Sequence, residues 1–145
     1  MPLESGTYTI RSCEFNIGRP LAEDRSLLPK RIVVLPEEQT SVWEIEKIST
    51  DTYFLKNQNS PTGNIDNKVA ALLIMQEDAV KWRIEAIPQH GHNRYIIITE
   101  DRSKGWVASD EPFEQVKCQP LIVGPSVPPF YPQTEIFEIV RASME

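Results

Sequence analysis

Two histidines separated by one glycine are the side chains whose type and spacing could support catalysis or metal binding. His90 and His92 flank Gly91, and an imidazole can act as a general base or as a zinc ligand. A zinc site needs three or four ligands in suitable geometry, and the nearby carboxylates Glu100 and Asp101 come only after a further predicted strand. We therefore expect two exposed turn histidines and no metal site.

No other motif indicates an enzyme. The chain contains no Gly-x-Ser-x-Gly turn that would expose an activated serine. It also contains neither a phosphate-binding loop nor a dinucleotide-binding fingerprint. The two cysteines, Cys13 and Cys118, are too few for a disulfide framework or a metal cluster, so we expect two reduced thiols. The sequence thus predicts a protein that is not an enzyme and that binds no cofactor or metal.

The composition excludes two other classes of partner. The net charge is −6, whereas binding to nucleic acid requires a basic surface. No run of about 18 apolar residues is present, so no membrane span is expected. The first residues contain neither a basic segment nor an apolar stretch, so we expect no secretory signal and a cytoplasmic location. The length predicts a single domain, residues 1–145, and we expect a monomer.

With catalysis excluded, function is expected in loops that a rigid frame positions. Four segments combine turn-forming or polar residues with enough length to contact a partner. They are residues 18–30, the asparagine-rich residues 56–68, residues 90–93 and the proline-rich residues 124–133.

The frame is indicated by two phrases that each occur three times. The first places an aromatic residue two positions before an isoleucine, in residues 43–48, 82–87 and 137–142. The second begins with a tyrosine, in residues 8–10, 53–55 and 95–97. Such a repeat indicates one supersecondary unit used several times, and three units are too few for an open solenoid. Three units closing around an axis predict a β-trefoil, with equivalent core positions for Trp43, Trp82 and Phe137.

Alternating apolar and polar residues, together with β-branched runs, predict the strands of this all-β fold. The 12 prolines favour short strands and many loops, because proline is excluded from helix interiors and central strands. We expect little or no helix, although residues 21–28 could form a helical turn and residues 70–79 have helical propensity. About twelve strands in three repeats are expected, near residues 6–12, 15–20, 31–36, 41–49, 52–57, 65–68, 69–76, 80–87, 94–100, 105–109, 116–123 and 135–142.

Segments spread over nearly the whole chain resemble the mushroom β-trefoil protease inhibitors. The matching segments are residues 6–10, residues 29–36, Trp43 with Ile45, and residues 137–139. The nearest members are the cospin-type trypsin inhibitors (mycospins), while clitocypin and the macrocypins are more distant relatives by fold. The resemblance implies a protease inhibitor with a role in fungal defence.

In cospin-type inhibitors the loop between the second and third strands presents an arginine to trypsin, so the resemblance implies this role for residues 18–30. Arg19 is followed by Pro20, which makes a poor scissile bond, so Arg19 is the second choice of anchor. Arg25 is followed by Ser26, and we expect the Arg25–Ser26 bond to be the reactive site. The expected supporting residues of the loop are Glu23, Asp24, Leu27 and Pro29.

The chemistry of an exposed arginine suits this role. A trypsin-like serine protease has an aspartate at the base of its specificity pocket, and an arginine that fills the pocket becomes a desolvated, charge-paired anchor. Rigidity then separates an inhibitor from a substrate. A loop held on both sides of the bond keeps the new amine beside the acyl-enzyme and favours religation. The expected partner is therefore a trypsin-like serine protease.

Two alternative functions remain open, besides a plain storage or scaffold role for the trefoil. The resemblance to clitocypin implies an inhibitor of cysteine proteases or of asparaginyl endopeptidase, which would use residues 56–68 with Asn57, Asn59 or Asn64 as the anchor. Asparagine is also common in turns for backbone reasons alone. The other alternative is a sugar-binding trefoil lectin, although the Gln-x-Trp phrase usual in each lectin repeat is absent here.

Overall fold

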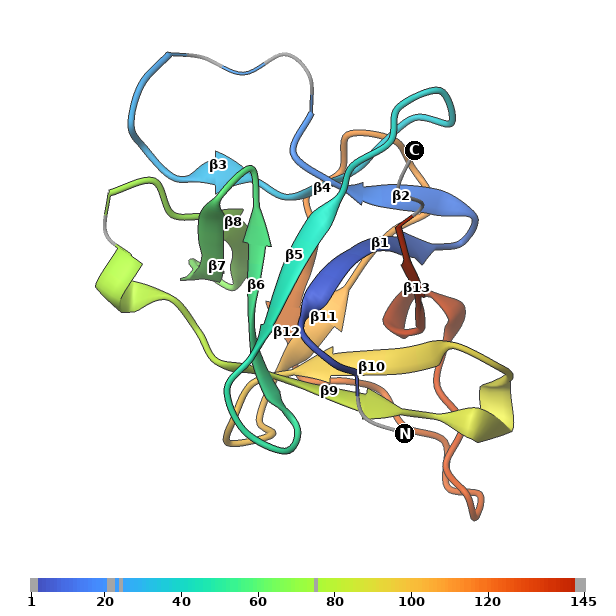
Figure 1. Ribbon diagram of the computed structural model, residues 1–145. Helices are drawn as coiled ribbons and strands as arrows, with labels where there is room; N and C mark the ends of the chain where they lie inside the picture. The colour runs from blue at the N-terminus through green and yellow to red at the C-terminus, as the bar shows by residue number, and fades with distance from the viewer. Residues whose placement is uncertain (1–2, 21–22, 24, 75, 143–145) are drawn as a thin grey trace.

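The computed structural model describes residues 3–20, 23, 25–74 and 76–142 and forms an all-β trefoil (Figure 1). The strands within these residues are β1 (Gly6–Ser12), β2 (Phe15–Gly18), β3 (Lys30–Arg31), β4 (Val33–Val34), β5 (Trp43–Lys47), β6 (Thr52–Asn57), β7 (Ser60–Ile65), β8 (Lys68–Ala71), β9 (Trp82–Ala86), β10 (Arg94–Ile98), β11 (Gly105–Val107), β12 (Lys117–Gln119) and β13 (Phe137–Arg141). The helices there are three short 3₁₀ turns, η1 (Gln76–Asp78), η2 (Pro88–His90) and η3 (Gln133–Glu135). None of them is long or apolar enough to span a membrane.

Six strands close into a barrel in the ring order β1, β5, β6, β9, β10 and β13. Each strand of the ring pairs antiparallel with both neighbours, so the barrel has no free edge. The two repeated phrases meet at three junctions of this ring. Their register partners are Tyr8 with Trp43, Tyr53 with Trp82, and Tyr95 with Phe137. The triple repeat in the sequence therefore marks three equivalent junctions in space.

Shorter strands form the cap of the barrel through the pairs β2–β4, β7–β8 and β11–β12. Further pairs, β3–β8 and β8–β12, connect these hairpins to one another. The strand expected near residues 31–36 is divided at Ile32, because β3 turns to pair with β8 while β4 pairs with β2. That division explains why the structure has one strand more than the twelve expected.

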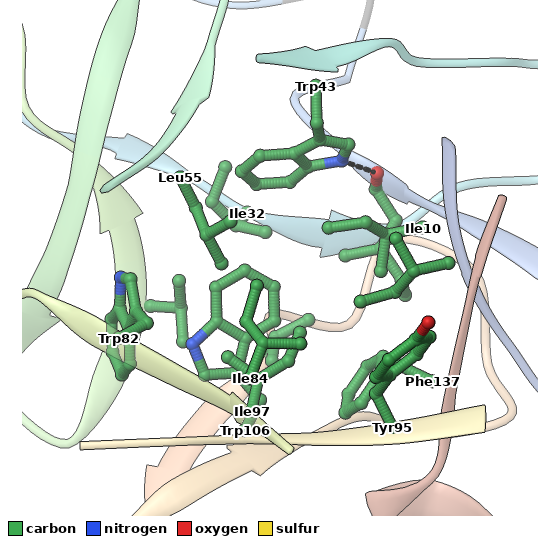
Figure 2. Packing of buried hydrophobic residues seen from close by; sticks show 14 of the residues in the cluster. Ile10, Ile32, Trp43, Leu55, Trp82, Ile84, Tyr95, Ile97, Trp106 and Phe137 are labelled. Atoms are coloured by element: carbon green, nitrogen blue, oxygen red, sulfur yellow. Dashed lines mark hydrogen bonds between the residues drawn. The ribbon is translucent and has the colours of Figure 1, made fainter. Parts of the chain in front are cut away.

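The core centres on Trp106 of β11, which the three repeated aromatic residues contact from different sides (Figure 2). The ring centroid of Trp106 lies 5.7 Å from that of Trp43, 5.5 Å from Trp82 and 5.9 Å from Phe137. The Trp82 and Phe137 rings meet it edge-on, the arrangement that aromatic quadrupoles favour. All four rings are fully buried, which confirms the expected core role of the repeated aromatic positions.

The segment expected as a long asparagine-rich loop, residues 56–68, instead contains two tight turns. The strands expected near residues 65–68 and 69–76 are wrong in position, because the observed strands are β7 (Ser60–Ile65) and β8 (Lys68–Ala71). The two turns consist of Gln58–Asn59 and Asp66–Asn67, all four with positive φ, and β7 lies between them. Two consecutive residues with positive φ match the twist of antiparallel strands. Pro61 lies in β7, where its carbonyl oxygen accepts a hydrogen bond from the Leu72 N–H.

Three smaller expectations also differ from the structure. The helical propensity of residues 70–79 yields only η1, because residues 70–71 belong to β8. The strand expected over residues 116–123 ends at Gln119, one residue before a proline that cannot donate to the sheet. Residues 25–28 are bends with no helical turn, and the rest of the expected turn, at residues 21–22 and 24, lies outside the described residues.

Both cysteines are free thiols, as the sequence indicated. Cys118 is fully buried and Cys13 is partly exposed in the β1–β2 turn. Burial raises the pKa of the Cys118 thiol from 9.0 to about 11, and alkylating reagents require the thiolate. We expect iodoacetamide at pH 8 to label Cys13 in the native protein and Cys118 only after denaturation, as measured by mass spectrometry. Equal native labelling of both, or a Cys13–Cys118 disulfide, would contradict this.

The same pKa has a consequence for stability. The folded protein holds the Cys118 proton more tightly than the unfolded chain does, so this contribution to stability is present below pH 9 and is lost as the pH rises towards about 11. We expect the unfolding midpoint of the wild type to fall over that range more than that of Cys118→Ala, in paired thermal melts.

Replacing Trp106 tests the central position of its ring. Trp106→Ala should cost about 3–5 kcal/mol of unfolding free energy in urea titrations, because a large cavity opens among buried rings. Trp106→Phe should cost less, because it retains an aromatic ring and removes an indole N–H that has no hydrogen-bond partner among the described residues. Val127→Ala, at a side chain 97% exposed, is the matched control and should be near neutral. A similar small cost for Trp106→Ala would contradict the assigned role.

Candidate functional site

The loop between β2 and β3 projects away from the barrel at the upper left of Figure 1. It leaves the frame after Gly18 and returns at Lys30. Residues 25–29 are all exposed, and Leu27 and Leu28 are apolar side chains that face water. An exposed segment without regular structure, held between two strands, is the arrangement that a protein partner can bind as an extended chain.

Arg25 lies in this exposed segment, and Ser26 on its carboxyl side is tied to the far end of the loop. The Ser26 hydroxyl accepts hydrogen bonds from Lys30 Nζ and from the Leu28 backbone N–H, each at 3.4 Å. Lys30 itself is buried where it enters β3. The residue after the expected reactive bond is thus linked to the barrel. Of the expected supporting residues, Pro29 is exposed beside Lys30, while Asp24 lies outside the described residues.

Arg19, the second choice of anchor, has a different environment. Its side chain is only 8% exposed and forms a two-pronged ion pair with Glu23, with Nη2–Oε1 and Nε–Oε2 distances of 2.7 and 2.9 Å. Its Nη1 also donates to the backbone carbonyl of Asn57 at 3.4 Å. The guanidinium is therefore occupied within the protein, whereas Arg25 is exposed. Only Arg25 of the two presents its side chain to a partner in this conformation.

The loop rests on a platform of three residues, Gly18, Ser41 and Asn57. Asn57 is fully buried, and its Nδ2 donates to Ser41 Oγ at 2.9 Å. Gly18 is required here because a Cβ atom at that position would collide with the Ser41 side chain. The indole N–H of Trp43 donates to the Ile17 carbonyl at 2.7 Å, as the dashed line in Figure 2 shows. The end of β2 is thus attached directly to the core.

The asparagines of the alternative site do not form one binding segment. Asn57 is fully buried in the platform, which contradicts its expected role as an exposed anchor. Asn59 is exposed at the β6–β7 turn, with φ of 69°. Asn64 is partly buried in β7, opposite Val69 of β8. A two-residue turn leaves little extended chain for a protease cleft.

The proline-rich segment is a second projecting loop, seen at the lower right of Figure 1. Its tip residue Val127 is almost fully exposed. His90 holds its base, because His90 Nε2 accepts a hydrogen bond from the Tyr131 backbone N–H at 3.0 Å, so the expectation that His90 is a plain exposed turn residue is wrong. The buried Glu135 accepts a hydrogen bond from the Ile122 N–H at 2.7 Å, and burial raises the pKa of its carboxyl group.

The described residues contain no cluster of histidine, cysteine or acidic side chains that could hold a metal ion. The sequence reasoning missed Ser41 and gave Asn57 a different role, because their contacts join residues far apart in the chain. A glycine followed by an arginine at the end of a strand is the only local trace of the platform, and this pattern alone is common.

Comparison with known proteins gives matches over nearly the whole chain. The family model described as peptidase inhibitor I66 matches residues 1–141. A Lentinula edodes protein named "Serine protease inhibitor" is 51% identical over 141 residues, which cover 96% of this chain and 98% of the relative. A solved structure of a proteinase inhibitor from Coprinopsis cinerea matches with a TM-score of 0.88 and 41% identity, covering 97% of this chain and 99% of that chain.

A more distant structure shows only the fold. The Macrolepiota procera ricin B-like lectin, solved with lactose, matches with a TM-score of 0.70 at 14% identity and covers 98% of this chain and 99% of that chain. At this level of identity the similarity reflects the shared trefoil, and the same frame serves proteins of unrelated function.

Proposed function

Since the chain belongs to the peptidase inhibitor I66 family, we propose that it inhibits serine proteases of trypsin-like specificity by inserting Arg25 into their specificity pocket. Membership of this family makes the protein an inhibitor and not an enzyme. The proposal includes the monomeric state and the cytoplasmic location that the sequence suggests. Its partner would be the protease alone, with no cofactor.

The observation that carries the proposal is the contrast between the two arginines of the loop. Arg25 is exposed in a segment without secondary structure, and Arg19 is paired with Glu23 beneath it. A trypsin-like pocket needs a side chain that is free to leave water and to pair with its aspartate. Arg25 meets that requirement, while Arg19 would first have to break its ion pair.

The loop would bind as a substrate does. The protease serine Oγ attacks the Arg25 carbonyl carbon, and the bond to the Ser26 nitrogen breaks as that nitrogen receives a proton from the protease histidine. An acyl-enzyme and a new amine at Ser26 result. If the amine stays in place, it attacks the ester, re-forms the peptide bond and returns the serine hydroxyl with its proton. If it departs, water hydrolyses the ester and the inhibitor is consumed.

The exposed Leu27 and Leu28 extend the contact beyond the reactive bond. They follow Ser26 directly, so they would face the protease surface that binds residues on the leaving-group side. Burying each apolar side chain contributes roughly 1.5–3 kcal/mol before the costs of association. They add area to the interface, while the charged anchor supplies the selectivity for a pocket with an aspartate.

Substitution of Arg25 gives the direct test. Arg25→Ala should weaken trypsin inhibition by about 30-fold to several thousand-fold, the equivalent of 2–5 kcal/mol for removing one partner of a buried charge pair. Arg25→Lys should retain weakened inhibition, because lysine reaches the pocket charge without the planar fork. Both variants should melt like the parent, since exposed substitutions usually stay within about 0.5 kcal/mol. Arg102→Ala, at an exposed turn remote in sequence, is the control.

A panel of proteases separates the proposal from its alternatives. Residual activity would be measured for trypsin, chymotrypsin, a papain-type protease and asparaginyl endopeptidase, with a glycan array alongside. We expect inhibition of trypsin and no glycan binding. Inhibition of asparaginyl endopeptidase that is lost in Asn59→Ala would support the alternative loop, and unchanged trypsin inhibition by Arg25→Ala would place the reactive site elsewhere.

A further inference from the structure

We infer that the Arg19–Glu23 ion pair is the positioning device that keeps this loop an inhibitor and prevents it from being consumed as a substrate. The inference rests on the proposed function, because it concerns the fate of the Arg25–Ser26 bond after a protease has bound. It gives Arg19 a role different from that of an anchor: Arg19 acts on the reactive bond through Glu23 and does not touch the protease.

The ion pair is built more firmly than an ordinary surface pair. The Arg19 and Glu23 side chains are 8% and 17% exposed, and two parallel hydrogen bonds join them. A two-pronged bond between a guanidinium and a carboxylate fixes direction as well as distance. Because the pair is largely shielded from water, solvent and salt weaken it less than they weaken an exposed pair. It joins Arg19 to Glu23, which lies two positions before Arg25 in the sequence.

The pair is also attached to the barrel. Arg19 Nη1 donates to the carbonyl of Asn57, the last residue of β6 and the register partner of Trp43 in β5. The buried Asn57 side chain in turn holds Ser41 against Gly18. Movement of Glu23 is therefore opposed by the barrel wall, and not only by the loop.

The other side of the reactive bond has a separate attachment. Ser26 Oγ accepts a hydrogen bond from Lys30 Nζ, and Lys30 pairs with Ala71 of β8. Each half of the loop, one ending at Arg25 and the other beginning at Ser26, thus has an attachment to the barrel among the described residues. Once a protease has cut between them, the frame still holds both cut ends.

Religation depends on this double attachment. The Ser26 amine must remain within bonding distance of the Arg25 acyl carbon. When the protein holds the amine there, its effective concentration at the acyl-enzyme is high, which favours re-formation of the peptide bond. Loss of the Arg19–Glu23 pair frees the acyl half while Lys30 still holds the amine half. The two ends then separate, water attacks the ester, and hydrolysis of the Arg25–Ser26 bond competes successfully with its re-formation.

The test compares cleavage with inhibition in variants of the pair. Glu23→Gln keeps the shape of the side chain and removes its negative charge. Arg19→Gln removes the guanidinium group that donates both hydrogen bonds to Glu23. The matched control is Glu138→Gln, which removes the ion pair with Arg94 on strands β10 and β13 (3.1 Å). Each protein is incubated with a catalytic amount of trypsin, and mass spectrometry follows cleavage at Arg25–Ser26 while residual inhibition is assayed. Thermal melts establish that each variant is folded.

We expect Glu23→Gln and Arg19→Gln to inhibit trypsin at first and then to lose inhibition. Cleavage at Arg25–Ser26 should be roughly 10- to 100-fold faster than in the parent, because losing a hydrogen bond to a charged group has an effect of this size. The control should match the parent. Because Arg19 and Glu23 act as one pair, the double variant should be cleaved no faster than the faster single variant.

The failure of this inference differs from failure of the proposed function. If folded Glu23→Gln and Arg19→Gln resist cleavage for as long as the parent, the ion pair does not position the bond, even where Arg25→Ala abolishes inhibition. Faster cleavage at another bond would overturn the inference equally. If Arg19→Gln unfolds, the less buried Glu23→Gln decides. A parent that does not inhibit trypsin at all would instead refute the proposed function.

Discussion

The packing of three equivalent aromatic rings against Trp106 is the constraint on which the rest of the structure depends. Trp43, Trp82 and Phe137 come from three repeats, and each is the register partner of a tyrosine at a barrel junction. A shift of any of these strands by one residue would turn its ring out of the core and leave a void that close packing does not tolerate. Trp43 also fixes the end of β2 beside the loop, because its indole N–H donates a hydrogen bond to the Ile17 carbonyl.

The loop depends on the frame for its geometry because it has little packing of its own. Ion pairs on the barrel surface, such as that between Arg102 and Glu85, contribute about 0–1 kcal/mol because water and salt screen them. The Arg19–Glu23 pair is largely shielded, and hydrogen bonds to charged groups contribute about 1.5–3 kcal/mol. This pair lies at the base of the loop, where the barrel wall supports it. The exposed half, from Arg25 to Pro29, is left available for binding.

The parts of the structure that follow from local patterns could be predicted, and those that depend on long-range contacts could not. The aromatic and tyrosine phrases repeat in the sequence, so the trefoil and the burial of Trp43 were accessible from it. The Gln58–Asn59 turn was mistaken for part of a loop, because its left-handed conformation is set by the twist of the strands and glutamine gives no sign of it. The pairing of Arg19 depends on a platform residue, Asn57, 38 positions away. No local pattern could therefore rank the two arginines by exposure. The resemblance to known inhibitors indicated the loop, and the choice of Arg25 came from Pro20, which makes the bond after Arg19 a poor scissile bond.

The strands that bound the loop are anchored on different neighbours, since β2 pairs with β4 and β1, and β3 pairs with β8. The spacing of the two stems is therefore set by the barrel and not by the residues between them. Such an arrangement uncouples the evolution of specificity from the evolution of stability. Mutations can accumulate in the exposed half, from Arg25 to Pro29, and redirect the molecule to proteases with other pockets, while selection for folding acts on the buried core of the barrel. The same scaffold can therefore present loops of different sequence at one fixed position.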